Sequence, residues 1–278
     1  FLVCFALIVS FLGLSFSAEP FSGYNQKEWE VLRCTNKERI ARGIAPLSMF
    51  DRLQGIASVR EGELGILFDQ NHKRPDGRPW KTAFAEAGLD YTYAGENIAS
   101  GFTSADAVVA AWMKSPLHRD NILNPDYCHL GVGASEAKYW VQSFSGDDTC
   151  KASSLSLSFP SGARLSNFDW DKSDIVVIVR CAKHGACVLP ICSEMASIEP
   201  SGLTGSYNLT VRIGSLTAFE RVYDASCQAI KGDVNGDLRV TSSDAVLLKR
   251  NLARWNSQII ENNADVDSDG KVTSKDGV

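Results

Sequence analysis

The first half of the chain alternates between helical and strand patterns of apolar residues. Apolar positions recur near a helical period over residues 29–40 and again over residues 49–64. A third helix is predicted to begin after Ser104, a good N-cap residue, and two short runs, LGVGA and YWVQSF, then predict the strands of a hairpin. Helices and antiparallel strands segregated in this way predict an α+β layered domain over residues 23–150.

The pattern changes between residues 153 and 228 to short alternating apolar runs. They are separated by clusters of Gly, Pro, Ser and Asp, and read SLSLSF, DIVVIVRCA, CVLPIC and YNLTVRI. Such runs are typical of a small β-sandwich or barrel, so we predict a β-rich linker or Ig-like module here. Trp170 and Tyr207 could stack on sugar rings in this region, but core packing explains isolated aromatic residues equally well.

The first 18 residues predict export. Residues 1–17 carry no charge and end in small residues, and the run is shorter than the about 20 apolar residues that a bilayer-spanning helix needs. This is typical of a secretory signal peptide, and the absence of an initial Met and of a basic segment indicates a truncated leader on a fragment. We therefore expect a secreted, extracellular protein without a transmembrane anchor.

Composition narrows the class of partner. The chain has 278 residues, a formal net charge of -5, 44% hydrophobic residues and 22% charged residues, an ordinary globular composition. A phosphate backbone is held by clustered Lys and Arg, and the sequence contains no such cluster. We therefore expect no nucleic-acid partner.

Seven cysteines follow Cys4, and in an exported chain they can form disulfides. The count is odd, so one thiol stays free or pairs in trans. We expect two local bridges within the group Cys181, Cys187, Cys192 and Cys227. A zinc site in this group has less support, because the spacing lacks a C-x2-C pair and no His lies at a partner spacing. The nearby His184 has no assigned role, and His129 is expected to be a surface residue at a strand end.

The end of the chain contains a repeat. DVNGDLRVTSSD is followed 32 residues later by DVDSDGKVTSKD. Oxygen atoms at alternate loop positions are what a calcium ion needs, so we predict two calcium sites. The predicted ligands of the first loop are Asp233, Asn235, Asp237, the Arg239 carbonyl, Thr241 and Asp244, and those of the second are Asp265, Asp267, Asp269, the Lys271 carbonyl, Thr273 and Asp276.

Both loops end in Asp instead of the usual Glu, and no helix pattern precedes the first, which predicts a loop-then-helix half-hand. The repeat resembles the type I dockerin module over residues 231–278, with an incomplete second repeat and with Leu238 in place of the usual Gly. The resemblance implies two bound calcium ions and docking onto a cohesin domain of a cellulosome scaffoldin. The cohesin-facing residues it implies are Ser242, Ser243, Lys249, Arg250, Ser274 and Lys275.

Five segments of the first half resemble the CAP superfamily (SCP/TAPS proteins) in its bacterial short form: HKRPDGRPW, AGENIASG, AWMKSPLHRDNIL, LGVGA and YWVQSF. The resemblance implies an α-β-α sandwich with a shallow cleft lined by two His and two Glu. Three of these four match His72, Glu96 and His118, and Ser115 replaces the second Glu. Two imidazoles and one carboxylate could hold zinc or another divalent ion with water in the open position.

Three functions follow from these features. The first is a secreted CAP-domain protein, docked in the setting of polysaccharide catabolism, whose cleft binds a cell-wall, lipid or protein ligand. The second is a metal-dependent extracellular hydrolase, acting on peptides or polysaccharide, whose metal is held by His72, Glu96 and His118; the alternative for these residues is that neighbouring hydrogen bonds satisfy them. The third is an adhesive role for the β-rich region.

Overall fold

The computed structural model describes most of the chain after its first 23 residues. The described ranges are 24–136, 138–147, 152–158, 175–200, 206–223, 231–234, 240–253, 259, 264–267 and 270–277. The predicted signal peptide, Cys150, Trp170 and Cys227 lie outside them. None of the described helices is long and apolar enough to cross a membrane.

A three-stranded antiparallel sheet forms the centre of the first domain. Its strand order is β1-β3-β2, and the two outer strands both pair with β3. The strands are β1 (Tyr93–Ser100), β2 (His129–Ala134) and β3 (Tyr139–Gly146), and the helices are α1 (Gln26–Ile40), α2 (Asp51–Ile66), α3 (Thr82–Glu86), α4 (Ala105–Lys114) and α5 (Pro116–Ile122). The predicted hairpin of LGVGA and YWVQSF is the β2–β3 pair. The outer strand β1, which carries AGENIA, was not predicted as a strand.

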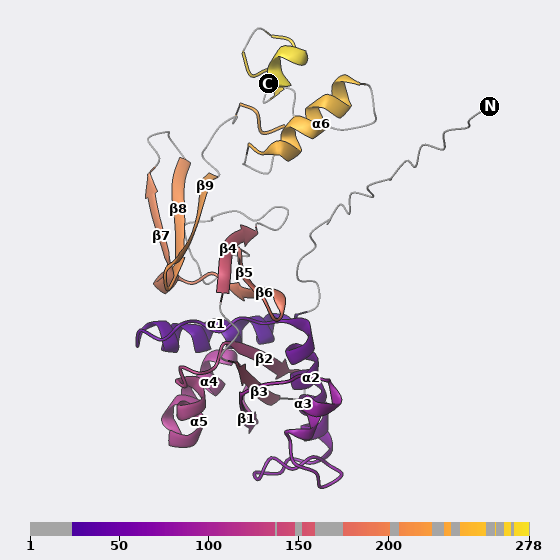
Figure 1. Cartoon of the computed structure of the whole chain (residues 1–278), viewed down its shortest axis with the longest axis vertical. Helices are drawn as coiled ribbons and strands as arrows, with labels where there is room; N and C mark the ends of the chain where they lie inside the picture. The colour runs from indigo at the N-terminus through magenta and orange to yellow at the C-terminus, as the bar shows by residue number, and fades with distance from the viewer. Residues whose placement is uncertain are drawn as a thin grey trace, which may run out of the picture.

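Helices cover both faces of this sheet, as Figure 1 shows. Trp140 and Phe144 of β3 pack with α1 and α4 in one buried cluster, whereas Val141 between them packs with α2 in another. Successive side chains of a strand point to opposite faces, so one strand supplies both interfaces. The result is the predicted α+β fold with three layers, α-β-α.

Helix α2 lies unusually close to the edge strand β2. A Cβ atom added at Gly131 would collide with the backbone carbonyl of Leu53, and one added at Gly133 would collide with that of Ala57. The close approach lets the Gln54 side chain hydrogen bond to the Val132 backbone, donating to its carbonyl at 2.7 Å and accepting from its N–H at 2.9 Å. The outward backbone groups of Val132 in this edge strand are thereby satisfied within the domain.

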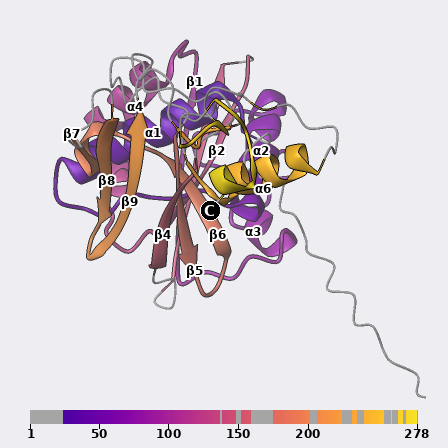
Figure 2. The same ribbon diagram turned by 90° about the horizontal axis from the view of Figure 1, so that it is seen from above.

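The middle region forms two further antiparallel sheets, ordered β4-β5-β6 and β7-β8-β9. They stand beside each other in Figures 1 and 2. The elements are β4 (Ala152–Ser158), β5 (Val176–Cys181), β6 (Gly185–Pro190), the 3-10 turn η2 (Ser193–Met195), β7 (Ala196–Pro200), β8 (Ser206–Ile213) and β9 (Leu216–Tyr223). These strands agree with the prediction of a β-rich region. Tyr207 packs against the buried core, which favours the packing explanation of this residue over sugar stacking.

The middle region shares its core with the first domain. Val177 and Val188 belong to the same buried cluster as Val31 and Leu32 of α1. Backbone hydrogen bonds join Met49 to Val188, from the Met49 N–H at 2.6 Å and to the Met49 carbonyl at 2.8 Å. The β-rich region is therefore packed onto the first domain.

The cysteine pairing differs from the expectation. Cys187 and Cys192 are buried free thiols in the structure, so the two local bridges predicted for their group are not formed there. Cys34, on α1, is also a free thiol and donates a hydrogen bond to the Asp106 carboxylate at 3.0 Å. Burial, with a contribution from Asp106, raises the pKa of Cys34 to about 12, so this thiol stays protonated at neutral pH.

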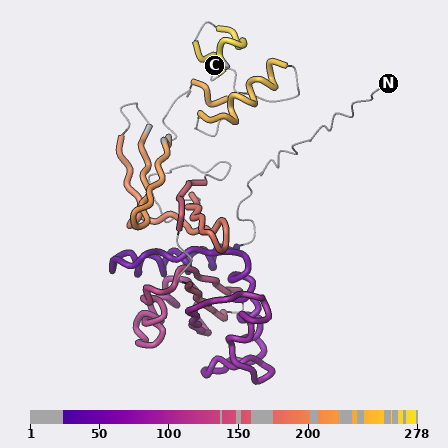
Figure 3. Tube along the Cα trace, viewed as in Figure 1, coloured from indigo at the N-terminus to yellow at the C-terminus, as the bar shows by residue number. Residues whose placement is uncertain are grey.

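The C-terminal part has its own small core. Val234, Leu248 and Ala264 are buried together, and Leu248 comes from α6 (Ser242–Leu252). The described remainder ends in a short 3-10 turn, η3 (Ser274–Gly277). In the trace of Figure 3 this part lies at the opposite end of the molecule from the first sheet. Helix α6 directly follows the first acidic loop, as the half-hand prediction expects.

The close packing of α2 against β2 leads to a prediction about the free energy of unfolding. Gly131→Ala should lower the free energy of unfolding by roughly 1–3 kcal/mol, because the added methyl group must push α2 away from β2. Gly62→Ala, on the exposed side of the same helix, meets no atom within 4 Å and should raise stability by up to about 1 kcal/mol. Urea unfolding of both variants, followed by tryptophan fluorescence, checks this. Equal effects of the two substitutions would contradict the close approach.

Candidate functional site

Glu96 of β1 is the buried centre of the polar cluster in the first domain. Its side chain is 0% exposed, and so is that of Arg60 from α2. The guanidinium donates from Nε to Oε2 at 2.8 Å and from Nη2 to Oε1 at 3.1 Å. A bidentate pair of this kind fixes the orientation of both side chains and also balances their charges.

His72 completes the cluster from the loop after α2. Its Nδ1 lies 2.8 Å from Glu96 Oε1, and its backbone carbonyl accepts a hydrogen bond from Arg60 Nη2 at 3.3 Å. The backbone of His72 has φ of 61°, in the left-handed region that non-glycine residues seldom adopt. The loop is therefore held in an unfavourable conformation that turns this imidazole toward Glu96.

A chain of alternating charges extends from Arg60 toward solvent. Arg60 Nη1 donates to Glu63 at 2.5 Å, and Glu63 accepts from Arg74 at 2.6 Å. Arg74 in turn donates to Glu86 at 2.7 Å, and Glu86 also accepts from Arg78. Burial disfavours the charged form of Arg60, but its hydrogen bonds to Glu96 and Glu63 outweigh that effect and raise its pKa. Glu86 thus belongs to a network of ion pairs on α3, consistent with a structural role.

His118 approaches the cluster from α5. Asn97 Nδ2 donates to its backbone carbonyl at 3.1 Å and also to Gln142 Oε1 at 3.0 Å, and Asn121 donates to Asn97 Oδ1 at 2.9 Å. These amides anchor α5 to the sheet. Burial and, second, the charge of nearby His72 lower the pKa of His118, so its imidazole is neutral at neutral pH. Ser115 lies half-buried at the junction of α4 and α5.

The arrangement of His72, Glu96 and His118 disfavours the binding of a metal ion by these three side chains. Among the described residues, the ligand atoms of His72, Glu96 and His118 do not form a group within 4.8 Å of one another. Both oxygens of Glu96 already accept hydrogen bonds from Arg60. A metal bound by Glu96 would have to compete with a buried guanidinium, so the His72–Glu96–His118 zinc site has little support from the geometry.

The second acidic loop brings three carboxylates together. Oxygen atoms of Asp265, Asp267 and Asp276 lie within 4.8 Å of one another. Asp276 accepts hydrogen bonds from the backbone N–H groups of Thr273 at 2.7 Å and Val266 at 2.8 Å, and these bonds lower the pKa of its carboxyl. Thr273 therefore lies beside the three carboxylates, and Lys271 is exposed. The predicted ligand Asp269 lies outside the described residues.

The first loop is folded in the same way at its ends. Asp233 and Asp244 are buried, and Asp244 accepts from the N–H groups of Val234 at 3.1 Å and Thr241 at 2.7 Å. Thr241 also caps α6, where its side chain accepts from the Ser243 N–H at 3.1 Å. The corresponding bonds of Asp276 in the second loop repeat this pattern. The other predicted ligands, Asn235, Asp237 and Arg239, lie outside the described residues.

The six residues that the dockerin resemblance assigns to cohesin are all exposed. Four of them, Ser242, Ser243, Lys249 and Arg250, lie on α6, where Val246 is 48% exposed between them. Residues four and seven positions apart lie on one side of a helix, so this set forms one face. Ser274 and Lys275 are on η3.

His129 does not lie on the surface as expected. It is 3% exposed at the start of β2, with Nδ1 at 3.0 Å from the Ser48 hydroxyl and Phe50 edge-on to its ring. Burial is the main cause that lowers its pKa to about 3, so the ring is neutral. The fully apolar strand LGVGA that follows was the available signal, because a strand buried on both faces tends to bury its first residue as well.

Comparisons with known proteins identify two domains. The model of the cysteine-rich secretory protein family, CAP, matches residues 32–144, and that of the dockerin type I domain matches residues 231–277. The chain therefore contains a CAP domain followed, after the β-rich region, by a dockerin type I domain.

Two curated relatives come from Bacillus subtilis. The uncharacterized protein YkwD is 37% identical over 127 residues, 45% of this chain and 49% of that protein. The uncharacterized membrane protein YlbC is 35% identical over 120 residues, 42% of this chain and 34% of that protein. The chain thus spans about half the length of the first and about a third of the second.

Solved structures similar to the chain include two from other bacteria. An extracellular protein containing an SCP domain from Bacillus anthracis has 23% identity and a TM-score of 0.42, covering 44% of this chain and 40% of that one. A cysteine-rich secretory protein from Staphylococcus aureus has 21% identity and a TM-score of 0.40, covering 46% and 40%.

The buried ion pair makes a prediction. Glu96→Gln should lower the free energy of unfolding by about 3 kcal/mol, because it leaves the buried Arg60 charge with Glu63 as its remaining carboxylate partner among the described residues. Glu86→Gln removes a carboxylate from the same network at a position where water screens the charges, and should cost far less. Urea unfolding at neutral pH compares the two variants. A loss at Glu86 as large as that at Glu96 would contradict this account.

Proposed function

We propose that this chain is a secreted protein whose dockerin docks, in a calcium-dependent way, onto a cohesin domain of a cellulosome scaffold and thereby displays its CAP domain. The observation that carries the proposal is the convergence of Asp265, Asp267 and Asp276, held by backbone N–H groups in a loop of the dockerin type I domain. Carboxylates this close repel one another, and a hard divalent cation offsets that repulsion.

Calcium and docking are linked through α6. The first loop ends at Asp244, which is also the third residue of α6 and accepts hydrogen bonds from the loop. An ion bound by this carboxylate therefore orients the helix on which Ser242, Ser243, Lys249 and Arg250 are exposed. We expect cohesin to bind that face only when the loops are loaded.

The CAP domain is the part that would meet the ligand. Two partly exposed polar residues lie near the cluster, namely His72, whose side chain is 21% exposed, and His118, which is half-buried. A cell-wall, lipid or protein ligand is the class that the CAP family suggests, and polysaccharide catabolism is the setting that a dockerin suggests. The buried pairing of Glu96 with Arg60 favours this binding role over the metal-dependent hydrolase.

The calcium prediction concerns stoichiometry. Calorimetric titration of the calcium-free full chain should give two ions, and Asp244→Ala and Asp276→Ala should each remove one, because each variant deletes the carboxylate that closes its loop. Ser274→Ala, an exposed neighbour of the second loop, should retain both ions. Two ions in either Asp variant would contradict the assignment of that loop.

The docking prediction concerns the α6 face. The double substitution Lys249→Glu and Arg250→Glu should weaken binding to type I cohesin domains by tenfold or more, while calcium binding is unchanged. Lys114→Glu, a charge reversal on the exposed end of α4, is the matched control and should bind cohesin normally. Surface plasmon resonance in calcium and in chelator measures both. Cohesin binding that survives chelator would overturn the proposed calcium dependence.

A further inference from the structure

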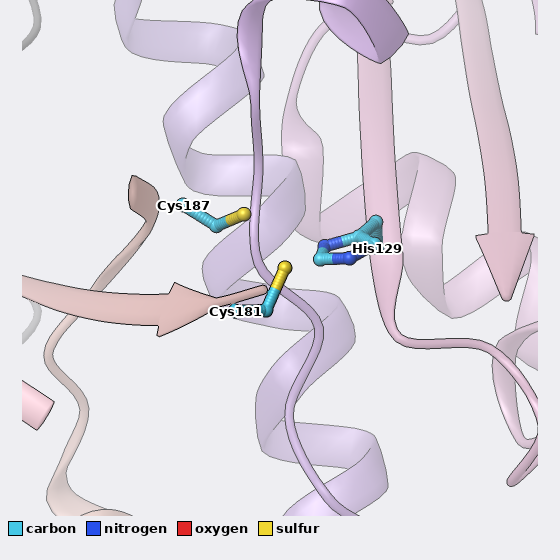
Figure 4. Close-up of side chains that lie close together, drawn as sticks. All are labelled: His129, Cys181 and Cys187. Atoms are coloured by element: carbon cyan, nitrogen blue, oxygen red, sulfur yellow. The ribbon is translucent and has the colours of Figure 1, made fainter. Parts of the chain in front are cut away.

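Two cysteines of the β-rich region meet a histidine of the CAP domain in the interior. Cys181 ends β5, Cys187 lies in β6, and His129 begins β2, 52 residues before Cys181 in the sequence. All three are buried, with 3% exposure for His129, 5% for Cys181 and 0% for Cys187. Figure 4 shows the two sulfur atoms and the imidazole turned toward one another.

We propose that His129, Cys181 and Cys187 bind one zinc ion that joins the β-rich region to the CAP domain. A nitrogen of His129 and the two Sγ atoms all lie within 4.8 Å of one another. Zinc binds thiolate sulfur at about 2.3 Å and imidazole nitrogen at about 2.0–2.1 Å, so ligand atoms around one tetrahedral ion are separated by about 3.5–3.8 Å. Small side-chain movements close the observed triangle on an ion, and water can occupy the fourth position.

Charge supports this donor set in a buried place. Two thiolates balance the two positive charges of zinc, and a neutral imidazole adds none, so the loaded site carries no net charge. Thiolate and imidazole are also the ligands that select zinc over the calcium that the dockerin loops would take.

Ser48 holds the site in place from the CAP side. Its hydroxyl lies 3.0 Å from His129 Nδ1 and also contacts the Cys187 thiol. The Ser48 backbone is fixed in turn, because its N–H donates to the Cys128 carbonyl at 3.2 Å and its carbonyl accepts from the Leu130 N–H at 3.0 Å. A hydrogen-bonded partner that orients the imidazole is the usual outer shell of a histidine metal ligand.

The strand register favours a metal over a disulfide between the two cysteines. Cys181 is paired with Gly185, and Cys187 with Val179, so the cysteines are diagonal neighbours on one face of the hairpin. Diagonal residues have Cα atoms about 7–8 Å apart, beyond the range of about 4.4–6.8 Å that a disulfide usually spans. A metal between the sulfurs bridges this longer distance and also uses His129.

The site lies at the junction between the β5–β6 hairpin and the CAP domain, so we expect the ion to stabilise the structure. The β5–β6 hairpin is held to the CAP domain by the Met49–Val188 hydrogen bonds, by His184 stacked on Phe50 at 4.2 Å, and by Lys183 paired with Asp147. An ion ligated from both sides of this junction would lock it. The site is separate from the dockerin loops, so it stands whether or not calcium and cohesin bind.

Cobalt is the probe that tests the proposal, since a thiolate–cobalt bond absorbs in the near ultraviolet and a four-coordinate ion in the visible. The full chain, purified reduced and free of metal, should bind one cobalt with both sets of bands, and one equivalent of zinc should abolish them. The dockerin loops offer only oxygen ligands, so they produce no sulfur band. A wild-type chain whose reduced thiols give no such band would overturn the proposal without any variant.

Variants locate the ligands. Cys181→Ser and Cys187→Ser should each weaken cobalt binding by at least tenfold, whereas Cys192→Ser and Cys34→Ser, which replace thiols outside the cluster, should retain the bands. Circular dichroism confirms that each variant is folded. Bands that persist in both cluster variants would overturn the assignment. So would a Cys181–Cys187 disulfide, detected by mass spectrometry as the loss of two hydrogens, in a native secreted chain that contains no zinc.

Discussion

The close approach of α2 to the central sheet is the constraint on which the first domain depends. It requires glycine at positions 131 and 133 of β2, because any side chain there would meet the helix backbone. With α2 in this position, Gln54 closes the edge of β2, and Arg60 reaches Glu96 through the interior. The buried guanidinium then orders the loop that carries His72.

This constraint explains why the polar cluster differs from a ready metal site. A carboxylate buried opposite an arginine stabilises the fold through the attraction of opposite charges and through directional hydrogen bonds. Both oxygens of Glu96 accept such bonds. His72 lies on a strained loop, and His118 lies on a short helix that is anchored by amides. Both histidines are thus held in rigid positions on either side of this carboxylate. Such a rigid polar surface suits recognition of a ligand.

The two ends of the chain have separate buried cores. The CAP domain shares one core with the β-rich region, whereas the dockerin has a small core of its own around Leu248. Figure 1 shows α6 at the far end of the molecule from β1. A docking module placed there leaves the polar cluster of the CAP domain away from the proposed scaffold contact.

Much of the molecule follows from local sequence. Helical periodicity predicted α1 and α2, the Ser104 cap predicted the start of α4, and the alternating apolar runs predicted the β-rich region, whereas α5 was not predicted. The strand β1 was missed because AGENIA combines a small residue, a carboxylate and an amide, whose burial depends on Arg60 and Gln142 from elsewhere. No local pattern reveals a partner that lies 36 or 45 residues away.

The sequence by itself determined the kinds of module and the residues of the acidic loops, because loop ligands lie at fixed spacings within one short segment. Tertiary structure alone decided where His129 lies and which side chains meet it. A strand-end histidine is exposed unless another part of the chain covers it, and here the β5–β6 hairpin does so. Packing between distant segments also paired Glu96 with Arg60, which lies outside the segment AGENIASG that contains Glu96.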